Sequence, residues 1–211
     1  ALVHKNAIVV GAAGSLPGDL QRLWHAGAEK GYHLEYGYSC MGYEVAGALG
    51  VKMAAPHRDT WVMVGDGSFL MMHSEIITAL QEGMKINIVL FDSSGFNCIK
   101  SLQCAFGSLG FGTDLRYRNP RTGQLDGETI KIDFAMLGRA LGLKTWSPHS
   151  WAELGAAIKE AGEHPSSTLI EVKIDPGSQS PGFDSYWQVA VSEVSKSPRT
   201  QLAREQQRNK S

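Results

Sequence analysis

One carboxylate, Asp66, stands between Gly65 and Gly67, directly after the apolar run at residues 60–64. Ser93 follows 27 positions later, at the end of a second apolar run. Carboxylate and hydroxyl oxygens are hard ligands, which suit a magnesium ion that also binds phosphate oxygens. The two glycines carry no Cβ, so the backbone can come close to an anion. This set of residues predicts a site for Mg²⁺ and a phosphate group.

A tight turn is the simpler explanation of the Gly-Asp-Gly tripeptide, because aspartate often caps the helix that follows a strand. The position of Ser93 favours the metal site. Right-handed crossovers place consecutive strands side by side, and ligands of an open parallel sheet bind beyond the carboxyl ends of its strands. A helix that begins near Ser68 would direct free N–H groups to the same edge. The backbone carbonyl of Gly95 is a third candidate metal ligand.

The elements that must position these residues alternate between apolar, β-rich runs and helical patterns. Strands are predicted at residues 7–10, 33–37, 60–65, 86–92, 143–147 and 168–174. Helices are predicted at residues 20–31, 42–55, 70–80 and 133–141, and after Ser150. Continuous apolar strands that alternate with helices predict an α/β fold, a three-layer, doubly wound parallel sheet.

Two further segments fit neither pattern. Residues 107–127 are rich in glycine and too long for an ordinary connection, which indicates a functional loop or a mobile one. The tail from residue 195 is charged, which predicts a solvated helix or disorder. We expect a compact domain at residues 1–180 and a C-terminal extension at residues 181–211.

Composition excludes several classes of protein. The net charge of -1 gives no electrostatic footprint for nucleic acid, and the sequence contains no apolar run of the roughly 18 residues that a membrane span needs. The three cysteines fit no zinc pattern and no disulfide framework, so we expect a reducing compartment, the cytoplasm. The chain starts without methionine or a signal-peptide pattern, and we expect it to be part of a longer protein.

A dinucleotide site is an alternative interpretation of the first strand end. The segment GAAGSLPG at residues 11–18 has the spacing G-x-x-G-x-x-x-G, which matches the dinucleotide fingerprint only loosely. Glu35 is the one acidic residue near the end of the second predicted strand, where such a site needs one. A non-catalytic phosphate- or nucleotide-binding module is an alternative of another class.

Residues 65–97, GDGSFLMMHSEIITALQEGMKINIVLFDSSGFN, resemble the cofactor motif of thiamin-diphosphate-dependent enzymes, in which Gly-Asp-Gly is followed at a similar distance by asparagine. The upstream segment SCMGYEVAGALG resembles the part of these enzymes that supports the folded cofactor. The resemblance covers nearly all of residues 5–175 and implies their C-terminal, pyrophosphate-binding domain. Ser93 departs from the family pattern, which has asparagine there, and a hydroxyl is the poorer metal ligand.

Within this superfamily, several segments are similar to the trihydroxycyclohexanedione hydrolases of myo-inositol catabolism. These segments are AAGSLPGDLQRLW, GYEVAGALGVKMA, LFDSSGFNCI, FGTDLRYRNPRTGQLDG and SYWQVAVSEVS. The resemblance implies a hydrolase that opens the cyclic 1,2-diketone trihydroxycyclohexanedione to 5-deoxy-glucuronate. The alternative within the superfamily is an acetolactate synthase-like enzyme, or another thiamin-diphosphate lyase or decarboxylase.

The resemblance also implies two cofactors, thiamin diphosphate and Mg²⁺, and a role for each matching residue. Asp66, Ser93 and the Gly95 carbonyl would hold the metal. Met41 would press between the two cofactor rings, although methionine also fills gaps in ordinary cores. The Ser39 carbonyl would accept a hydrogen bond from the cofactor's amino group. The residues expected to bind the diphosphate are Gly14, Ser15, Gly65, Gly67 and Ser68, the last through its N–H and its hydroxyl.

The family also needs a glutamate that contacts the pyrimidine ring of the cofactor. The resemblance implies that this residue lies in a separate pyrimidine-binding domain of the same enzyme, on a neighbouring subunit. We therefore expect a homodimer or homotetramer that acts on a small-molecule substrate. No residue of this chain is expected to be catalytic, and the chain alone is expected to have no turnover.

Overall fold

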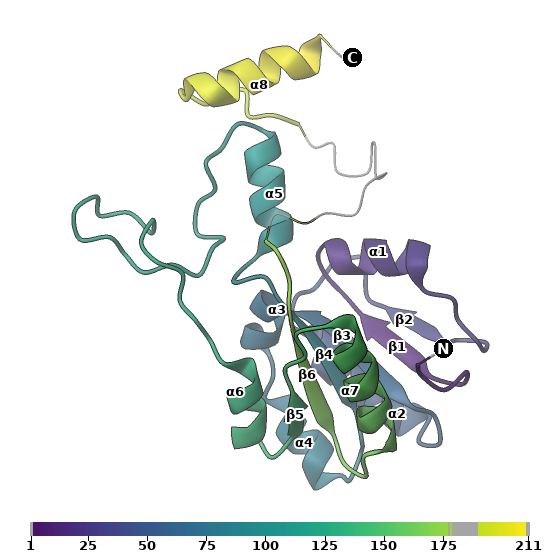
Figure 1. The fold of residues 1–211 in the computed structure, drawn as a ribbon. Helices are drawn as coiled ribbons and strands as arrows, with labels where there is room; N and C mark the ends of the chain where they lie inside the picture. Colours follow the sequence, from purple (N-terminus) through teal and green to yellow (C-terminus); the bar gives the residue numbers. More distant parts are fainter. Residues whose placement is uncertain (1, 177, 179–189, 210–211) are drawn as a thin grey trace. The chain divides into compact units, whose positions relative to one another are not determined.

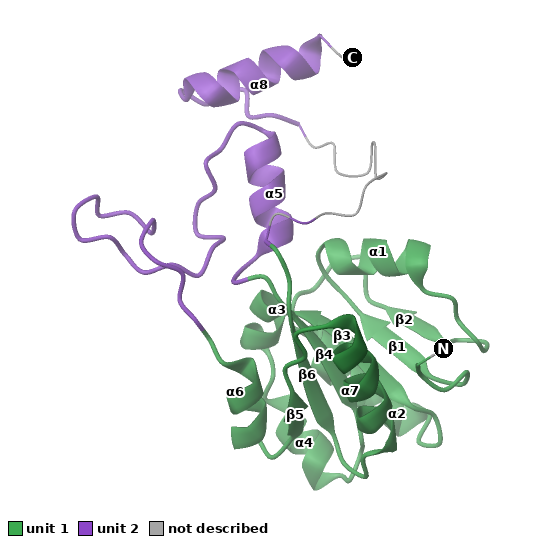
Figure 2. Ribbon diagram, in the orientation of Figure 1, with its two compact units in different colours: residues 1–93, 132–175 green, residues 94–131, 176–211 purple. Residues whose placement is uncertain are grey.

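The structure is a computed structural model that describes residues 2–176, 178 and 190–209. Its contacts divide the chain into two compact units, which Figure 2 colours separately. Unit 1 comprises Ala1–Ser93 and Ile132–Asp175, and unit 2 comprises Ser94–Lys131 and Pro176–Ser211. The boundary predicted between residues 180 and 181 lies outside the described residues and stays a prediction.

Unit 1 is built around one six-stranded sheet in which every pair of neighbouring strands is parallel (Figure 1). The strand order is β2-β1-β3-β4-β6-β5, so the chain starts in the interior of the sheet and builds outward in both directions. The strands are β1 (Ile8–Gly11), β2 (Tyr32–Leu34), β3 (Thr60–Gly65), β4 (Asn87–Asp92), β5 (Lys144–Trp146) and β6 (Thr168–Lys173). The predicted doubly wound parallel sheet is confirmed.

Helices cover both faces of this sheet. One buried cluster joins strand residues to α2 (Tyr43–Ala54), α3 (Asp66–Met71), α4 (Glu75–Gln81) and α6 (Phe134–Ala140). A second cluster joins the opposite strand faces to α1 (Ser15–Leu23) and α7 (Trp151–Glu163). Three layers result, as predicted.

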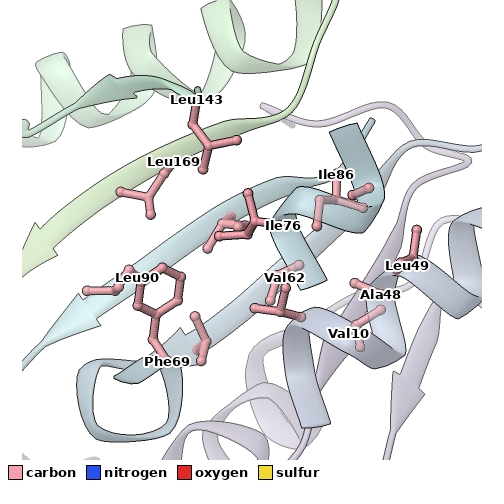
Figure 3. Close-up of a cluster of buried hydrophobic side chains, with 14 of the residues drawn as sticks. Val10, Ala48, Leu49, Val62, Phe69, Ile76, Ile86, Leu90, Leu143 and Leu169 are labelled. Atoms are coloured by element: carbon pink, nitrogen blue, oxygen red, sulfur yellow. The ribbon is translucent and has the colours of Figure 1, made fainter. Parts of the chain in front are cut away.

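Alternation along each strand explains the two clusters. Successive strand residues point to opposite faces of a sheet, so Val62 and Val64 belong to the first cluster whereas Trp61 and Met63 belong to the second. Figure 3 shows the first cluster, in which strand side chains meet those of the covering helices. Both faces of the central strands are therefore buried, which explains why the sequences of these strands are continuous apolar runs.

Two predicted helices differ from the structure. The helix predicted at residues 20–31 is wrong: α1 starts at Ser15 and ends at Leu23, and the chain turns extended at Trp24. The helix predicted at residues 70–80 is two helices, because Met72 leaves the helical conformation at φ -157 and ψ 67. The spacing of Leu70, His73, Ile77 and Leu80 gave no sign of that break.

Unit 2 contains two helices among its described residues, α5 (Asn97–Ala105) and α8 (Pro198–Arg208). The sequence did not predict α5, while α8 agrees with the helix alternative for the charged tail. Residues 107–127 form neither helix nor strand, but backbone hydrogen bonds such as those between Tyr117 and Glu128 or Gly127 hold part of them. All three cysteines are free thiols. None of the described helices is long and apolar enough to cross a membrane.

Candidate functional site

Asp66 and Ser93 lie together at the carboxyl ends of β3 and β4. The register pairs Gly65 with Phe91, so the two strands end side by side. Asp66 is 0% exposed and Ser93 is 7% exposed. The hydroxyl of Ser93 donates a hydrogen bond to Oδ1 of Asp66 at 3.3 Å. The structure thus brings together the two side chains that the spacing places on neighbouring strand ends.

The geometry of this pair fits two ligands of one magnesium ion. Adjacent ligands of an octahedral Mg²⁺ are about 3 Å apart when each metal–oxygen distance is about 2.1 Å, close to the observed 3.3 Å. A buried carboxylate such as Asp66 is costly without compensating charge, which a cation supplies. In the described part of the chain, no three His, Cys, Asp or Glu side chains could hold a metal. The other ligands would therefore be carbonyl, water or phosphate oxygens.

Asp92 precedes Ser93 but is engaged elsewhere. Its carboxylate forms an ion pair with the ammonium group of Lys173, which also contacts Glu171 at 2.7 Å. Burial lowers the pKa of Lys173, but the hydrogen bonds with Asp92 and Glu171 outweigh burial and raise the pKa above its usual value. The Asp92 carboxylate is therefore neutralised by Lys173, which distinguishes it from Asp66.

Gly65 leaves room beside this pair. Its backbone is extended, with φ -78 and ψ 154, a conformation that any residue adopts. A Cβ at Gly65 would meet no atom within 4 Å, so the missing side chain leaves open space at the carboxyl end of β3. Gly67 is buried in the first turn of α3. The residues at this strand end fit a bulky anion that lies against the backbone.

The hydroxyl of Ser68 is already used within the chain. It accepts a hydrogen bond from the Gly42 N–H at 2.7 Å and donates its hydrogen to Oε2 of Glu44 at 2.7 Å. A hydroxyl has one hydrogen to donate, and diphosphate oxygens need donors. In this conformation Ser68 can offer a diphosphate its backbone N–H, whereas its hydroxyl donates to Glu44.

Gly14 and Ser15 follow the carboxyl end of β1, next to β3 in the sheet. Strand order reverses between β1 and β3, and such a switch point is where ligands of doubly wound sheets bind. Gly14 has φ 92 and ψ -161, a backbone conformation that strongly favours glycine, and α1 begins at the exposed Ser15. The strand order therefore places Gly14 and Asp66 at ends of adjacent strands.

The turn that carries Ser39 is held by one carboxylate. Glu35 accepts hydrogen bonds from the backbone N–H of Cys40 at 2.7 Å and of Tyr38 at 3.1 Å. Those bonds, first from Cys40 and then from Tyr38, lower the pKa of Glu35. Ser39 lies between the two bound amides with φ 53, in the left-handed region that non-glycine residues rarely adopt. The direction of the Ser39 carbonyl is thus fixed from both sides.

Met41 is half-buried between this turn and the start of α2. It packs in neither of the two hydrophobic clusters found among the described residues. A methionine that filled a gap in the core would belong to one of them. Its placement therefore gives no support to the ordinary core role, and the cofactor-supporting role stays a prediction.

Gly95 belongs to unit 2 and pairs with Asp114 in an isolated bridge. A Cβ at Gly95 would come within 2.3 Å of the Thr113 carbonyl oxygen, and φ is 150. Close packing against residues 113–114 is thus one reason for a glycine here. The role of its carbonyl as a metal ligand stays a prediction.

Sequence reasoning missed two glutamates of this site. The sequence pattern indicates Glu35 only as the acidic residue of a dinucleotide site, and it indicates no role for Glu44. Glu44 is 1% exposed, yet it stands in the first turn of a helix, where an exposed acidic residue is common. The one signal available is its place between the Met41 segment and Val45, in a helix whose other residues, apart from Lys52, are small or apolar.

Comparison with known proteins supports the same interpretation. Residues 12–172 match the family "Thiamine pyrophosphate enzyme, C-terminal TPP binding domain". Over 204 residues, 97% of this chain, the sequence is 53% identical to a 3D-(3,5/4)-trihydroxycyclohexane-1,2-dione hydrolase of Bacillus thuringiensis (strain Al Hakam). It is 52% identical to the enzyme of that name from Bacillus cereus (strain AH820). The chain spans 32% of the length of each of these two relatives.

A solved structure has the same fold. The thiamine diphosphate-dependent 4-hydroxybenzoylformate decarboxylase of Rhodococcus jostii RHA1 superposes with a TM-score of 0.67 and 20% sequence identity. The match covers 82% of this chain and 30% of the decarboxylase. At this identity the likeness concerns the fold alone, and the family follows from the sequence match. The chain belongs to the thiamine pyrophosphate enzymes, and residues 12–172 are their C-terminal TPP-binding domain.

Proposed function

We propose that this chain supplies the diphosphate-binding half of the active site in an enzyme that hydrolyses trihydroxycyclohexanedione to 5-deoxy-glucuronate. The observation that carries the proposal is the buried pair of Asp66 and Ser93 at adjacent strand ends, with open space at Gly65. Relatives named as hydrolases of this diketone, 53% identical over 97% of the chain, support the choice of substrate. Since the chain spans 32% of those relatives, the activity belongs to the full-length protein.

In this proposal the Asp66 carboxylate and the Ser93 hydroxyl would hold Mg²⁺, with the Gly95 carbonyl as a further ligand. The metal leaves coordination positions for phosphate oxygens, as magnesium sites in proteins commonly do. The backbone at Gly65 and Gly67 would bind the diphosphate. The backbone N–H of Ser68, together with Gly14 and Ser15 on the neighbouring strand end, completes the diphosphate site.

The rings of the cofactor would lie beside the turn at residues 39–41. Thiamin diphosphate supplies the chemistry that cleaves a carbon–carbon bond next to a ketone, and the protein supplies binding and orientation. Met41 would support the bent conformation between the rings. The fixed carbonyl of Ser39 would accept a hydrogen bond from the amino group and so orient the pyrimidine ring.

The partner in this proposal is the pyrimidine-binding domain of the same enzyme on a neighbouring subunit. That domain would contribute the glutamate that the family resemblance places on the pyrimidine ring. Two half-sites on different subunits require at least a homodimer, and a homotetramer satisfies the same need. Each active site would then form only in the assembled enzyme.

The experiment that tests the proposal uses the full-length protein, thiamin diphosphate and Mg²⁺ with trihydroxycyclohexanedione. We expect formation of 5-deoxy-glucuronate that requires both cofactors. Pyruvate and benzoylformate serve as competing substrates, since they report acetolactate synthase and decarboxylase activity. Faster turnover of either competing substrate than of the diketone would contradict the proposed substrate while leaving the cofactor assignment in place.

A further inference from the structure

Glu44 is a fully buried acidic side chain to which the proposed chemistry gives no role. It is 1% exposed and lies in the first turn of α2. Glutamate is almost never fully buried unless hydrogen bonds or opposite charge compensate the loss of water. Burial raises the pKa of Glu44, while hydrogen bonds from Ser68 and from nearby backbone N–H groups act in the opposite direction. So costly a placement calls for a physical reason.

The contacts of Glu44 connect three segments that lie far apart in the sequence. Oε2 of Glu44 accepts the hydrogen of the Ser68 hydroxyl at 2.7 Å, from the segment that carries Asp66. The backbone N–H groups of Ala13 and Gly42 lie near enough to the Glu44 carboxylate to lower its pKa. Ala13 precedes Gly14 at the end of β1, and Gly42 follows Met41. Each of these segments is one that the proposed function assigns to the cofactor.

Through its hydrogen bond with Ser68, Glu44 also affects the position of Gly42. Because the single hydroxyl hydrogen of Ser68 is donated to Glu44, a lone pair of that oxygen faces the Gly42 N–H, which donates to it at 2.7 Å. Gly42 itself cannot readily adjust, since its φ is 86 and a Cβ there would come within 2.9 Å of Cβ of Met72. The Met41 turn is therefore attached to the diphosphate segment through a hydroxyl that Glu44 orients.

Ordinary helix capping does not account for this arrangement. The N-cap of α2 is Gly42, which has no side chain to cap the helix, so an acidic residue in the first turn is favourable. An exposed carboxylate would serve that purpose equally well. Capping also acts within one helix, whereas the Glu44 carboxylate bonds to a side chain 24 positions later in the sequence.

We propose that Glu44 is a positioning residue that holds the Gly14, Met41 and Asp66 segments in the arrangement that binds thiamin diphosphate. This inference rests on the proposed function, because it concerns the affinity of the same site for that cofactor. It assigns to Glu44 no contact with the cofactor or substrate. Its effect passes through the Ser68 hydroxyl and the backbone amides around it.

The test uses the full-length protein and calorimetric titration of thiamin diphosphate at saturating Mg²⁺. Glu44→Ala is expected to weaken binding by about 10- to 100-fold, the usual effect of losing an outer-shell partner. Glu44→Gln keeps an acceptor oxygen for Ser68 and is expected to restore affinity to within about threefold of the wild type. Ser68→Ala removes the same link from the other side and carries the test if Glu44→Ala does not fold.

A second measurement follows the hydrogen bond between the Gly42 N–H and the Ser68 hydroxyl in the absence of the cofactor. Hydrogen exchange of the Gly42 amide is expected to speed up in Glu44→Ala and Ser68→Ala, while the amide of Val62 in β3 keeps its protection. Thr168→Val is the matched control, because it deletes a buried hydrogen bond to Asn87 at the opposite end of the strands. This control is expected to lose stability and to keep its affinity for thiamin diphosphate.

Failure of the inference and failure of the proposed function look different. If the wild type does not bind thiamin diphosphate, the proposed function is wrong and the inference falls with it. If the wild type binds and Glu44→Ala binds equally well, with unchanged exchange at Gly42, only the positioning role is overturned. An equal loss of affinity in Thr168→Val would also overturn it, because the effect would then be general destabilisation.

Discussion

At the residue scale, the placement of Asp66 distinguishes a helix-capping aspartate from a metal ligand. A capping aspartate would stand at the N-cap and accept a hydrogen bond from the first turn of the helix. The N-cap of α3 is Gly65, and no side-chain cap bond forms there. Asp66 is instead the first residue of the helix, fully buried, with its carboxylate directed to Ser93 on the next strand. This placement favours the ligand role.

Asp66→Asn tests that role with little change in shape. The amide lacks the negative charge that binds Mg²⁺, and an interaction with a charged group contributes about 1.5–3 kcal/mol. We expect thiamin diphosphate to bind at least about tenfold more weakly at fixed Mg²⁺. Calorimetric titration of the full-length variant measures this, with the thermal midpoint of the cofactor-free protein as the control for folding. Unchanged affinity would remove Asp66 from the site.

Ser93 departs from the family pattern, and we expect its replacement by asparagine to increase the affinity for Mg²⁺. An amide oxygen is a better magnesium ligand than a neutral hydroxyl, so Ser93→Asn is expected to tighten Mg²⁺ binding by about fivefold, equivalent to about 1 kcal/mol. Ser93→Ala, the paired control, is expected to weaken it by a similar factor. The readout is the Mg²⁺ concentration that gives half-maximal binding of thiamin diphosphate. If all three proteins need the same concentration, Ser93 is not a ligand.

The burial of Glu44 is expected to make the free energy of unfolding depend on pH. Burial raises the pKa of this carboxyl above its usual 4.5, so the folded state keeps the proton after the unfolded state has lost it. The stabilisation is complete below pH 4.5 and is lost as the pH rises through the raised pKa. Glu44→Gln cannot ionise, so its stability relative to wild type should increase as the pH rises above 4.5 and through the raised pKa of Glu44. Thermal midpoints of both cofactor-free proteins measure it, and a constant difference would contradict the prediction.

At the scale of elements, close packing of α6 against the sheet depends on Gly138. A Cβ at this position would lie 2.9 Å from Cγ2 of Thr145 and 3.5 Å from Cβ of Leu169. Gly138→Ala is therefore expected to destabilise unit 1 by about 1–3 kcal/mol through overpacking. Native-state hydrogen exchange of the amides in β6 reports this locally.

Gly50 in α2 is the matched control for Gly138. A Cβ at Gly50 would meet no atom within 4 Å, and alanine is the better helix former. Gly50→Ala is expected to stabilise the protein by about 0.5–1 kcal/mol. If both alanine variants shift stability in the same direction, packing of α6 at Gly138 is not the cause of the loss.

The elements also show how far the sequence predicts the fold. The central strands were predicted within a residue or two, because burial on both faces makes them continuous apolar runs. Helix α1 was placed too late, since the pattern of Leu20, Leu23 and Trp24 carried no information about the start at Ser15. The break at Met72 and the helix α5 were missed, because apolar periodicity does not register a local change of backbone conformation.

The site was predictable where contacts follow from strand order. Asp66 and Ser93 follow consecutive strands, so their proximity could be inferred from a general rule of topology. The roles of Glu35 and Glu44 depend on the path of turns in three dimensions. Glu35 bonds to amides three and five residues ahead, and Glu44 reaches a hydroxyl in another helix. Nothing in their spacing distinguishes these two glutamates from exposed ones.

At the scale of the whole molecule, the proposed function makes this chain one part of a larger active site. It spans 32% of the length of its curated relatives, and the proposed pyrimidine-binding partner lies outside the residues described. We predict that the purified 211-residue chain hydrolyses no diketone, even with thiamin diphosphate and Mg²⁺. A product assay run beside the full-length protein measures this. Turnover by the chain alone would show that no second domain is required.

The central claim is that Mg²⁺ joins thiamin diphosphate to the buried pair of Asp66 and Ser93. Calorimetric titration of the full-length protein with thiamin diphosphate, with and without Mg²⁺, tests that claim most directly, and ADP is the competing ligand. We expect thiamin diphosphate to bind in a manner that depends on Mg²⁺ and is weakened by Asp66→Asn, and we expect no binding of ADP. Tighter binding of ADP than of thiamin diphosphate would contradict this assignment. An affinity for thiamin diphosphate that changes neither with Mg²⁺ nor with Asp66→Asn would also contradict it.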